Sequence, residues 1–357
     1  MRELLGRILW RLGAKSRAER LYGDILCRHP RQYSTRRRLT DLLLDGHRYE
    51  EALPHCQYLA EHWPEPASHW GRLGYALQML GRHDEAITAL RMALDRDPNN
   101  SSVYFNLAEN YDAKRLYQEA LVAYRHTVRL DPHNAEAVGN LGAILGQLGH
   151  WEDAAEFHRR AYALRPDPCF LYNLGVALDQ LDDLKGAEHV FRDLLKDNPE
   201  YADARIRLAR VLIDRERYED ALALIRSGGR PQEDPVLLGT LVEALDRTGR
   251  LDEALAVGLE ATRQFPEHGD VHSALGWVLL RLRRCEEALG QFEEAQRLAP
   301  GALEFRVGLG AVLSTLERHD EAIEVFKSVL QHEPDFFERY RDVVRYWDES
   351  RKATTKE

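Results

Sequence analysis

Apolar residues recur along the chain with the spacing of helices rather than of strands. In residues 67–100, a first apolar stripe has intervals of three and four residues, which is typical of one helix face. It consists of Trp70, Leu73, Leu77 and Leu80. Gly81 follows as a turn signal, and a second stripe then runs to a closing proline, Pro98. The second stripe consists of Ala86, Leu90 and Ala93. The pattern predicts two helices joined by a tight turn.

The same pattern recurs with a period of 33 or 34 residues. Its most regular element is an alanine early in the second helix of each unit, at Ala18, Ala52, Ala86, Ala120, Ala154, Ala187, Ala221, Ala254, Ala288 and Ala322. A leucine lies thirteen residues before each alanine, the next position is small in most units, and a proline lies twelve residues after the alanine in nine of ten. A single helix pair is too thin to bury its apolar face. Stacking on neighbouring units is therefore expected to form one continuous core.

In residues 67–100 the consensus is W-x-x-L-G-x-x-L, then A-x-x-x-L-x-x-A, then P. This motif and its period resemble the tetratricopeptide repeat, over almost the entire chain. The resemblance implies an all-α, right-handed superhelical solenoid of about ten helix-turn-helix units. The units are 1–32, 33–66, 67–100, 101–134, 135–167, 168–201, 202–234, 235–268, 269–302 and 303–336.

One unit departs from the pattern and divides the expected array. Unit 202–234 lacks the closing proline, and its second helix runs into the sequence Ser-Gly-Gly-Arg-Pro. We expect that helix to be short and the array to flex there. The expected organisation is units one to seven in 1–226, an irregular Gly/Pro break in 227–234, units eight to ten in 235–336, a capping helix in 337–351 and a disordered tail in 352–357.

The resemblance also implies that the first helices line a concave groove that binds an extended peptide or a helix. The sixth position of three successive units, which faces this groove, is an asparagine: Asn106, Asn140 and Asn173. An amide offers donors and an acceptor, so a row of amides suits an extended backbone. Tetratricopeptide arrays of protein O-glycosyltransferases look similar in this respect. Two interpretations stay open: a peptide-binding ladder, or asparagines that hold a neighbouring helix.

Aromatic and arginine side chains at other inner-facing positions are candidate anchors, because interfaces are enriched in both residue types. The candidates are Tyr75, Phe105, Tyr172, Trp277, Arg72, Arg207 and Arg210. For any one of them, a packing role or simple exposure is the alternative.

Charge is unevenly distributed. The formal net charge is −10, but the first 38 residues carry eleven Lys/Arg and three Asp/Glu, a local net charge of +8. This basic end is either a solvated helix face or a surface that steers acidic partners, and it leaves open a peripheral contact with an anionic surface. Nucleic acid is not expected as a partner, because the excess of basic residues is confined to this end and the body is acidic.

No apolar window is long enough to span a membrane, and Arg7 and Arg11 interrupt any apolar core of a secretory signal. The four cysteines are far apart and form no C-x-x-C motif, so we expect free thiols in a reducing, cytoplasmic compartment. No catalytic or phosphate-binding motif is present, and the histidines lack metal-ligand spacing.

We therefore predict no enzyme, no cofactor and no metal, but a protein-interaction scaffold or adaptor that binds an extended peptide or helix of a partner protein. The alternative is a substrate-recruiting subunit of a multi-protein enzyme complex.

Overall fold

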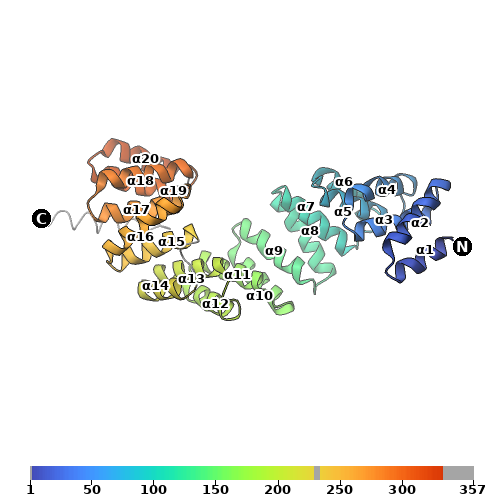
Figure 1. Cartoon of the computed structure of the whole chain (residues 1–357), viewed down its shortest axis with the longest axis horizontal. Coiled ribbons are helices and arrows are strands. Elements are labelled where there is room, and N and C mark those ends of the chain that lie inside the picture. Colours follow the sequence, from blue (N-terminus) through green and yellow to red (C-terminus); the bar gives the residue numbers. More distant parts are fainter. Residues whose placement is uncertain (1, 229–233, 333–357) are drawn as a thin grey trace. The chain divides into compact units, whose positions relative to one another are not determined.

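The structure is a computed structural model that describes residues 2–228 and 234–332. Within these ranges the chain forms twenty α-helices and no strand (Figure 1). The first ten helices are α1 (Arg2–Arg11), α2 (Lys15–Arg28), α3 (Tyr33–Asp45), α4 (Tyr49–His62), α5 (Ala67–Met79), α6 (His83–Leu94), α7 (Ser101–Ala113), α8 (Tyr117–Leu130), α9 (Ala135–Gln147) and α10 (Trp151–Leu164). The others are α11 (Pro168–Gln180), α12 (Leu184–Asp197), α13 (Ala202–Asp214), α14 (Tyr218–Ser227), α15 (Pro235–Arg247), α16 (Leu251–Gln264), α17 (Gly269–Arg281), α18 (Cys285–Leu298), α19 (Leu303–Thr315) and α20 (His319–His332).

The helices follow the register of the sequence repeat. From α3 to α19, each first helix begins at the first residue of a predicted unit and is 13 residues long. The all-α helical-repeat prediction is therefore confirmed. Helix α14 has 10 residues, whereas its neighbours α12 and α16 have 14, so the prediction of a short second helix in this unit is also confirmed.

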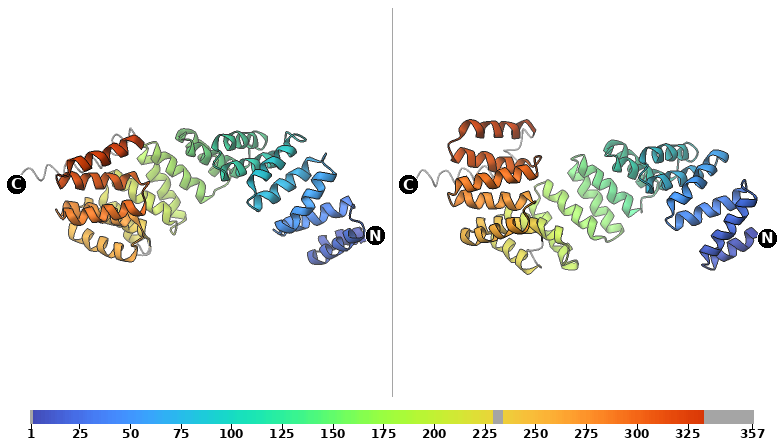
Figure 2. Two further views of the ribbon diagram at one scale, coloured as in Figure 1. Left: turned by 90° about the horizontal axis from the view of Figure 1, so that it is seen from above. Right: turned by 45° about the horizontal axis from the view of Figure 1, so that its top comes forward.

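The chain divides into two compact parts, Met1–Leu181 and Asp182–Glu357. From here on these two parts are called unit 1 and unit 2, and a single helix pair is called a repeat. Unit 1 contains α1 to α11, and unit 2 contains α12 to α20. In both, each second helix packs on the first helix of the next repeat, so successive helix pairs stack side by side (Figure 2). The break expected in 227–234 stays a prediction because 229–233 lie outside the described residues. The expected capping helix in 337–351 and the tail in 352–357 lie outside them as well.

The turn between the two helices of a repeat closes through one residue in the left-handed region. In the third repeat, Gly81 has a φ of 71°, and the next residue, Arg82, donates its backbone N–H to the carbonyl of Leu77 at 2.9 Å. This geometry satisfies carbonyls at the end of the helix. The same turn position has positive φ in all ten repeats, at Gly13, His47, Gly81, Arg115, Gly149, Asp182, Glu216, Gly249, Arg283 and Glu317. Six repeats therefore make this turn without glycine.

A small residue in the first helix allows the two helices of a repeat to approach closely. A Cβ atom on Gly276 of α17 would lie 2.9 Å from the ring of Phe292 on α18, which is too close for any real side chain. In repeat 235–268 the small residue is on the second helix and the larger residue is on the first. Its first helix has Val242 at the small position, and its second helix has Gly258 where Phe292 stands. The space beside Gly258 is occupied by Leu275 of the next first helix, 3.0 Å from the position of a Cβ.

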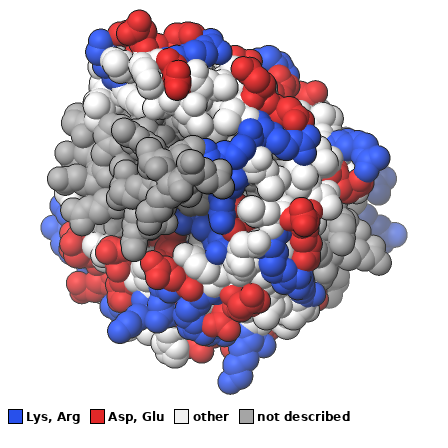
Figure 3. All heavy atoms as spheres, turned by 90° about the vertical axis from the view of Figure 1, so that its left-hand side faces the viewer, with Lys and Arg blue, Asp and Glu red and all other residues white. Residues whose placement is uncertain are grey.

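Ion pairs recur at the start of the second helices. In the third repeat, Arg82 precedes α6 and its Nη2 lies 2.7 Å from Oε2 of Glu85, and this hydrogen bond lowers the pKa of the carboxyl. The equivalent pairs are Arg48–Glu51, Arg217–Asp220, Arg250–Glu253, Arg284–Glu287 and Arg318–Glu321. These pairs are exposed and contribute little stability each. Acidic and basic side chains are interspersed on the face of unit 2 shown in Figure 3.

Candidate functional site

Within each unit, the first helices lie closer together than the second helices do. Helix α5 contacts α7 and α9 contacts α11 in unit 1, while α15 contacts both α13 and α17 in unit 2. Among the described helices, no two second helices make a comparable contact. A stack whose first helices are closer together curves toward them. The face formed by the first helices, here called the inner surface, is therefore the candidate binding surface.

The three predicted asparagines lie on successive first helices of unit 1. Asn106 on α7, Asn140 on α9 and Asn173 on α11 are all half-buried. Asn140 donates a hydrogen bond from Nδ2 to the hydroxyl of Tyr124 at 3.2 Å. Among the described residues, the side-chain amides of Asn106 and Asn173 have no hydrogen-bond partner. Two of the three amides are thus available to a ligand, and one is partly used by the scaffold.

Four carboxylates lie on first helices of unit 1, and the described part of the chain gives none of them an ion pair: Asp45 on α3, Glu109 and Asp112 on α7, and Glu136 on α9. Burial raises the pKa of Glu109, and the negative charges of Glu136 and Asp112 raise it further. A hydrogen bond from Nε2 of Gln78, at 2.8 Å, opposes this shift. Burial also raises the pKa of Asp112. The surroundings of Glu109 on the inner surface of unit 1 are therefore acidic, and none of the described Lys or Arg side chains pairs with these four carboxylates.

The sequence interpretation passed over these carboxylates. They occupy the same inner-facing positions of the repeat as the asparagines and aromatic residues: the second position for Glu136, the ninth for Glu109, the twelfth for Asp112 and the thirteenth for Asp45. The repeat phase could have found them if every inner-facing position had been inspected for charge.

The predicted aromatic residues of unit 1 are half-buried and partly engaged in packing. The Tyr75 ring lies edge-on to Tyr49 of α4, with centroids 5.9 Å apart. A hydrogen bond with Tyr49, burial and nearby negative charge raise the pKa of Tyr75 to about 12, so its hydroxyl stays protonated. The Phe105 ring lies edge-on to Tyr124 of α8, also at 5.9 Å. Tyr172 of α11 is half-buried as well.

Arg72 does not offer a free charge. Its Nε lies 2.6 Å from Oδ1 of Asp41 on α3, and its Nη1 donates to the carbonyl of Ser68 at 3.1 Å. Arg72 therefore bridges two first helices and neutralises Asp41. A sequence interpretation could not have shown this, because the two residues are 31 positions apart.

The remaining predicted residues lie in unit 2. Arg207 and Arg210 lie on α13, the first half-buried and the second exposed. Trp277 on α17 is half-buried, with its ring edge-on to Phe292 at 5.3 Å. The ten predicted residues thus form two groups. The seven in unit 1 lie on its first helices, and the three in unit 2 lie on first helices of that unit.

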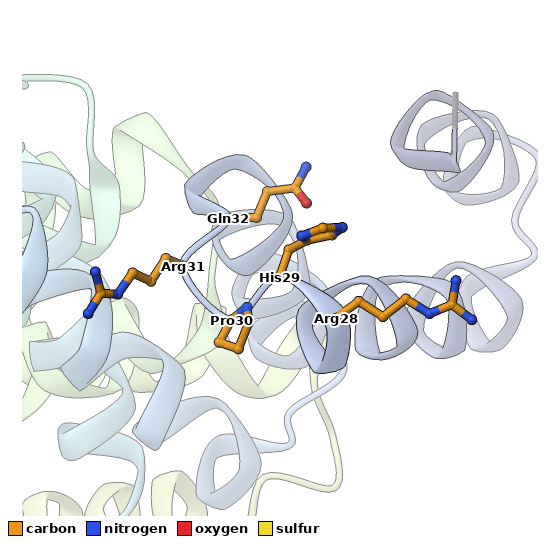
Figure 4. Close-up of a pocket in the computed structure, with 5 residues that line it drawn as sticks. All are labelled: Arg28, His29, Pro30, Arg31 and Gln32. Atoms are coloured by element: carbon orange, nitrogen blue, oxygen red, sulfur yellow. The ribbon is translucent and has the colours of Figure 1, made fainter.

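The basic N-terminal end contains a shallow hollow of about 550 Å³ at the loop between α2 and α3. Arg28, His29, Pro30, Arg31 and Gln32 line it. The side chains of Arg28 and Arg31 point away from each other (Figure 4), so they do not converge on one ligand. Nearby, Arg36 is already bound to His55 and to the carbonyl of Pro30. Part of the basic charge at this end is therefore already engaged in hydrogen bonds within the protein.

The described residues contain neither a cluster of metal ligands nor a membrane-spanning helix. No group of three or more His, Cys, Asp or Glu side chains in 2–228 and 234–332 is arranged to hold a metal ion. None of the described helices combines the length and the apolar character that crossing a membrane requires.

Comparison with known proteins identifies the repeat. The sequence profile of the tetratricopeptide repeat matches residues 37–101, 105–167 and 273–335. A second profile of the same repeat matches residues 178–235. The chain belongs to the tetratricopeptide-repeat family. Such arrays are typically non-catalytic scaffolds for protein interactions. Membership of this family therefore implies that the chain interacts with other proteins.

A solved structure shows the same fold. A tetratricopeptide repeat protein from Parabacteroides merdae is 19% identical, with a TM-score of 0.58 over 69% of this chain and 98% of that one. MamA is 22% identical, with a TM-score of 0.44 over 45% of this chain and 94% of its own. Pseudomonas aeruginosa pilF is 22% identical, with a TM-score of 0.46 over 57% and 94%. No curated protein sequence matches the chain.

Proposed function

We propose that the inner surface of unit 1 binds an extended segment of a partner protein that carries Lys or Arg side chains. The observation that supports this most directly is the set of carboxylates without an ion pair on α3, α7 and α9. At the start of many second helices one acidic residue is paired with arginine, as Glu85 is with Arg82. The inner carboxylates lie on first helices without such an arginine, and two of them add negative charge beside the half-buried Glu109, so a cation from a partner segment would be favoured there.

The asparagines complement this charge. An amide can accept from a backbone N–H and donate to a backbone carbonyl, which an extended segment presents on both edges. Asn106 and Asn173 have these groups available, and Asn140 keeps its carbonyl oxygen and one N–H. Amides that bind backbone without regard to sequence, beside carboxylates that select Lys or Arg, would bind basic extended segments. The helices are already ordered by stacking, so the receptor loses little entropy on binding.

The proposal also predicts a pH dependence. A cation binds the ionised form of Glu109, and the pKa of that carboxyl is raised in the free protein. Binding of a Lys or Arg would lower this pKa again, because a nearby positive charge favours the ionised carboxylate. Affinity for the partner is therefore full above the raised pKa and falls as the pH decreases through it.

The experiment is a pull-down with the full chain from lysate of the native organism, using wild type and three sets of variants. The first set is Asn106→Ala, Asn140→Ala and Asn173→Ala. The second is Glu109→Gln, Asp112→Asn and Glu136→Gln. The matched control is Glu50→Gln, Glu119→Gln and Glu152→Gln, which removes three exposed carboxylates from second helices. A captured partner should be lost with both inner-surface sets and kept by the control.

Binding of defined peptides then tests the chemistry. Fluorescence anisotropy should show that the chain binds an unstructured peptide with evenly spaced lysines and not the same peptide with glutamates. If a partner binds all four proteins equally, the inner surface of unit 1 is not the site. The identity of a captured partner also tests the alternative function, because a substrate-recruiting subunit should retain its catalytic subunit.

A further inference from the structure

A polar side chain lies in the core of the fourth repeat, where other repeats have apolar residues. Asn110 on α7 is fully buried. The equivalent residues lie ten positions before the alanine that marks each repeat, and they are buried and apolar. From the second repeat on they are Leu42, Ala76, Ile144, Ala177, Val211, Ala244, Val278 and Val312. Burying an amide costs free energy unless its donors and its acceptor are hydrogen-bonded, so the contacts of Asn110 should explain its presence.

Both ends of the Asn110 amide have partners. Nδ2 donates to the backbone carbonyl of Asn106 at 2.7 Å and to Oε1 of Gln78 on α5 at 2.9 Å. Oδ1 lies 2.9 Å from Nδ1 of His83 on α6, although the two residues are 27 positions apart. Asn110 therefore ties α7 to both helices of the preceding repeat.

The carbonyl of Asn106 fixes the direction of these hydrogen bonds. A carbonyl can accept but not donate, so the end of the Asn110 amide that faces it is the NH2 group. Oδ1 then faces His83, and Nδ1 of the imidazole has to donate to it. Gln78 presents its oxygen to Asn110, so its own Nε2 donates to Oε2 of Glu109 at 2.8 Å. The four side chains form one series of hydrogen bonds, here called the relay, in which each donates to the next from His83 to the carboxylate of Glu109.

The relay ends on the inner surface of unit 1, at one of its four carboxylates. The hydrogen bond from Gln78 favours the ionised form of Glu109, whereas burial and two neighbouring carboxylates oppose it. The titratable groups whose charges interact with Glu109 are Asp112 on the same helix, Glu136 on α9, Tyr75 on α5 and Tyr124 on α8. Helix α6 contributes His83, which is half-buried at the other end of the relay. The buried amide thus supports a carboxylate whose surroundings disfavour its charge.

We propose that Asn110 and His83 position Gln78, and that Gln78 in turn holds the Glu109 carboxylate in place for a Lys or Arg side chain of the partner segment. This inference rests on the proposed function. With Oε2 bound to Gln78, Oε1 is left to accept from the cation, and a carboxylate that is already ordered loses little entropy on binding. Asn110 is fully buried, so it acts on the ligand through Gln78 and Glu109 and is a positioning residue.

The titration of Glu109 tests the relay without a ligand. NMR follows it in the full chain, isotopically labelled at the carboxyl carbon of glutamate, and Glu109→Gln assigns the signal. Asn110→Val and Gln78→Leu should each move the titration of Glu109 to higher pH, because the carboxylate loses the oriented donor that favours its ionised form. Thr127→Val is the matched control, since Thr127 on α8 is also fully buried but its hydroxyl donates to the carbonyl of Ala123. That variant should leave the titration unchanged.

Fluorescence anisotropy with the lysine peptide then measures the effect on binding. At neutral pH, Gln78→Leu and Asn110→Val should weaken binding roughly tenfold, because the ionised carboxylate loses a hydrogen bond. His83→Tyr should weaken it less, since the carbonyl of Asn106 still orients the Asn110 amide. Asn110→Val should unfold at the same urea concentration as wild type or higher, because valine fills the equivalent position in repeats such as those of Val211 and Val278. A merely structural role would give the opposite result, with lower stability and unchanged affinity.

Circular dichroism verifies folding, and Asn110→Ala replaces Asn110→Val if that variant does not fold. An unchanged titration of Glu109 in the folded Asn110 and Gln78 variants overturns the inference, as does an affinity for the lysine peptide equal to that of wild type. If wild type does not bind the lysine peptide, the proposed function is wrong, and the titration still decides whether the relay controls Glu109.

Discussion

Gly74 on α5 and Leu90 on α6 occupy one shared space, because a Cβ atom on Gly74 would lie 2.5 Å from Cγ of Leu90. Leu90 is fully buried, so it cannot move aside into solvent. The glycine is therefore required by the size of its partner, and the distance between the two helices depends on the pair together.

Replacing Gly74 by alanine should destabilise the protein by about 1–3 kcal/mol, the usual cost of overpacking a tight core. Leu90→Ala should cost about 2–5 kcal/mol through the cavity it leaves. The double variant should be more stable than the sum of the two losses predicts, by about 1 kcal/mol or more, because the new methyl group fills part of that cavity. Urea unfolding followed by circular dichroism measures all three. Strictly additive losses would show that the two side chains do not share the space.

The glycines of the turns should be sensitive for a different reason. Gly81 has a φ of 71° and no neighbour within 4 Å of a Cβ, so Gly81→Ala introduces backbone strain without a clash. The expected loss is about 1 kcal/mol. Gly290→Ala is the control, because Gly290 lies inside helix α18 with equally open space around it. That substitution should instead stabilise the protein by about 0.5–1 kcal/mol. Thermal unfolding should shift in opposite directions for the two variants.

His158 should make stability depend on pH. It is 3% exposed, its Nδ1 has no hydrogen-bond partner among the described residues, and burial lowers its pKa from 6.5 to about 4. The unfolded chain therefore takes up a proton below pH 6.5 that the folded chain takes up only near pH 4. The stability contribution is fully present above pH 6.5 and is lost as the pH falls toward 4.

His158→Phe removes this group and keeps the packing, since Phe191 and Phe292 occupy the equivalent position in other repeats. Between neutral pH and the lowered pKa, the wild type should lose about 2–3 kcal/mol more free energy of unfolding than the variant does, at 1.36 kcal/mol per unit of pKa shift. Urea unfolding of both proteins across this range measures the difference. Parallel pH profiles would show that the histidine is not buried in its neutral form.

The four cysteines should differ in reactivity. All four are free, with Cys27 and Cys169 exposed and Cys56 buried. Burial raises the pKa of the Cys56 thiol to about 12, so little of the reactive thiolate forms. Iodoacetamide at mildly alkaline pH should modify Cys27 and Cys169 quickly and Cys56 only after unfolding in urea. Mass spectrometry of tryptic peptides locates the label, and rapid labelling of native Cys56 would contradict the packing of α4. The reducing, cytoplasmic compartment expected from these thiols stays a prediction.

The register of the fold could be predicted from the sequence because the repeat marks it independently in each unit. The first helices begin where the period places them, from Tyr33 to Leu303. The turns were harder to predict from the sequence. Gly81 is a visible signal, but Arg115 and Glu216 adopt the same positive φ because the surrounding helices impose it. The combination of Val242 with Gly258 was also missed, since each residue departs from the consensus on its own and the space beside Gly258 is filled from the next repeat, by Leu275.

The places of the candidate residues on the first helices could be predicted from the sequence. Whether each side chain already has a hydrogen-bond or ion-pair partner could not. The repeat phase identifies which side chains face inward, and Asn106 and Asn173 are found there with open amides. Which of the others are already paired depends on contacts between repeats. Arg72 is neutralised by Asp41 on another helix, and Asn140 is tied to Tyr124. Such partners vary from repeat to repeat, so the period carries no information about them.

The exchange of sizes in repeat 235–268 limits how this gene can be rearranged. Repeat arrays lengthen and shorten when a crossover joins two misaligned copies. A crossover inside this hairpin could join α15, with Val242, to a second helix that carries a phenylalanine such as Phe292, and the two would clash. The reciprocal product would place Gly276 opposite Gly258 and leave a void. Whole repeats can be gained or lost at this point, but the two halves of this repeat have to be inherited together.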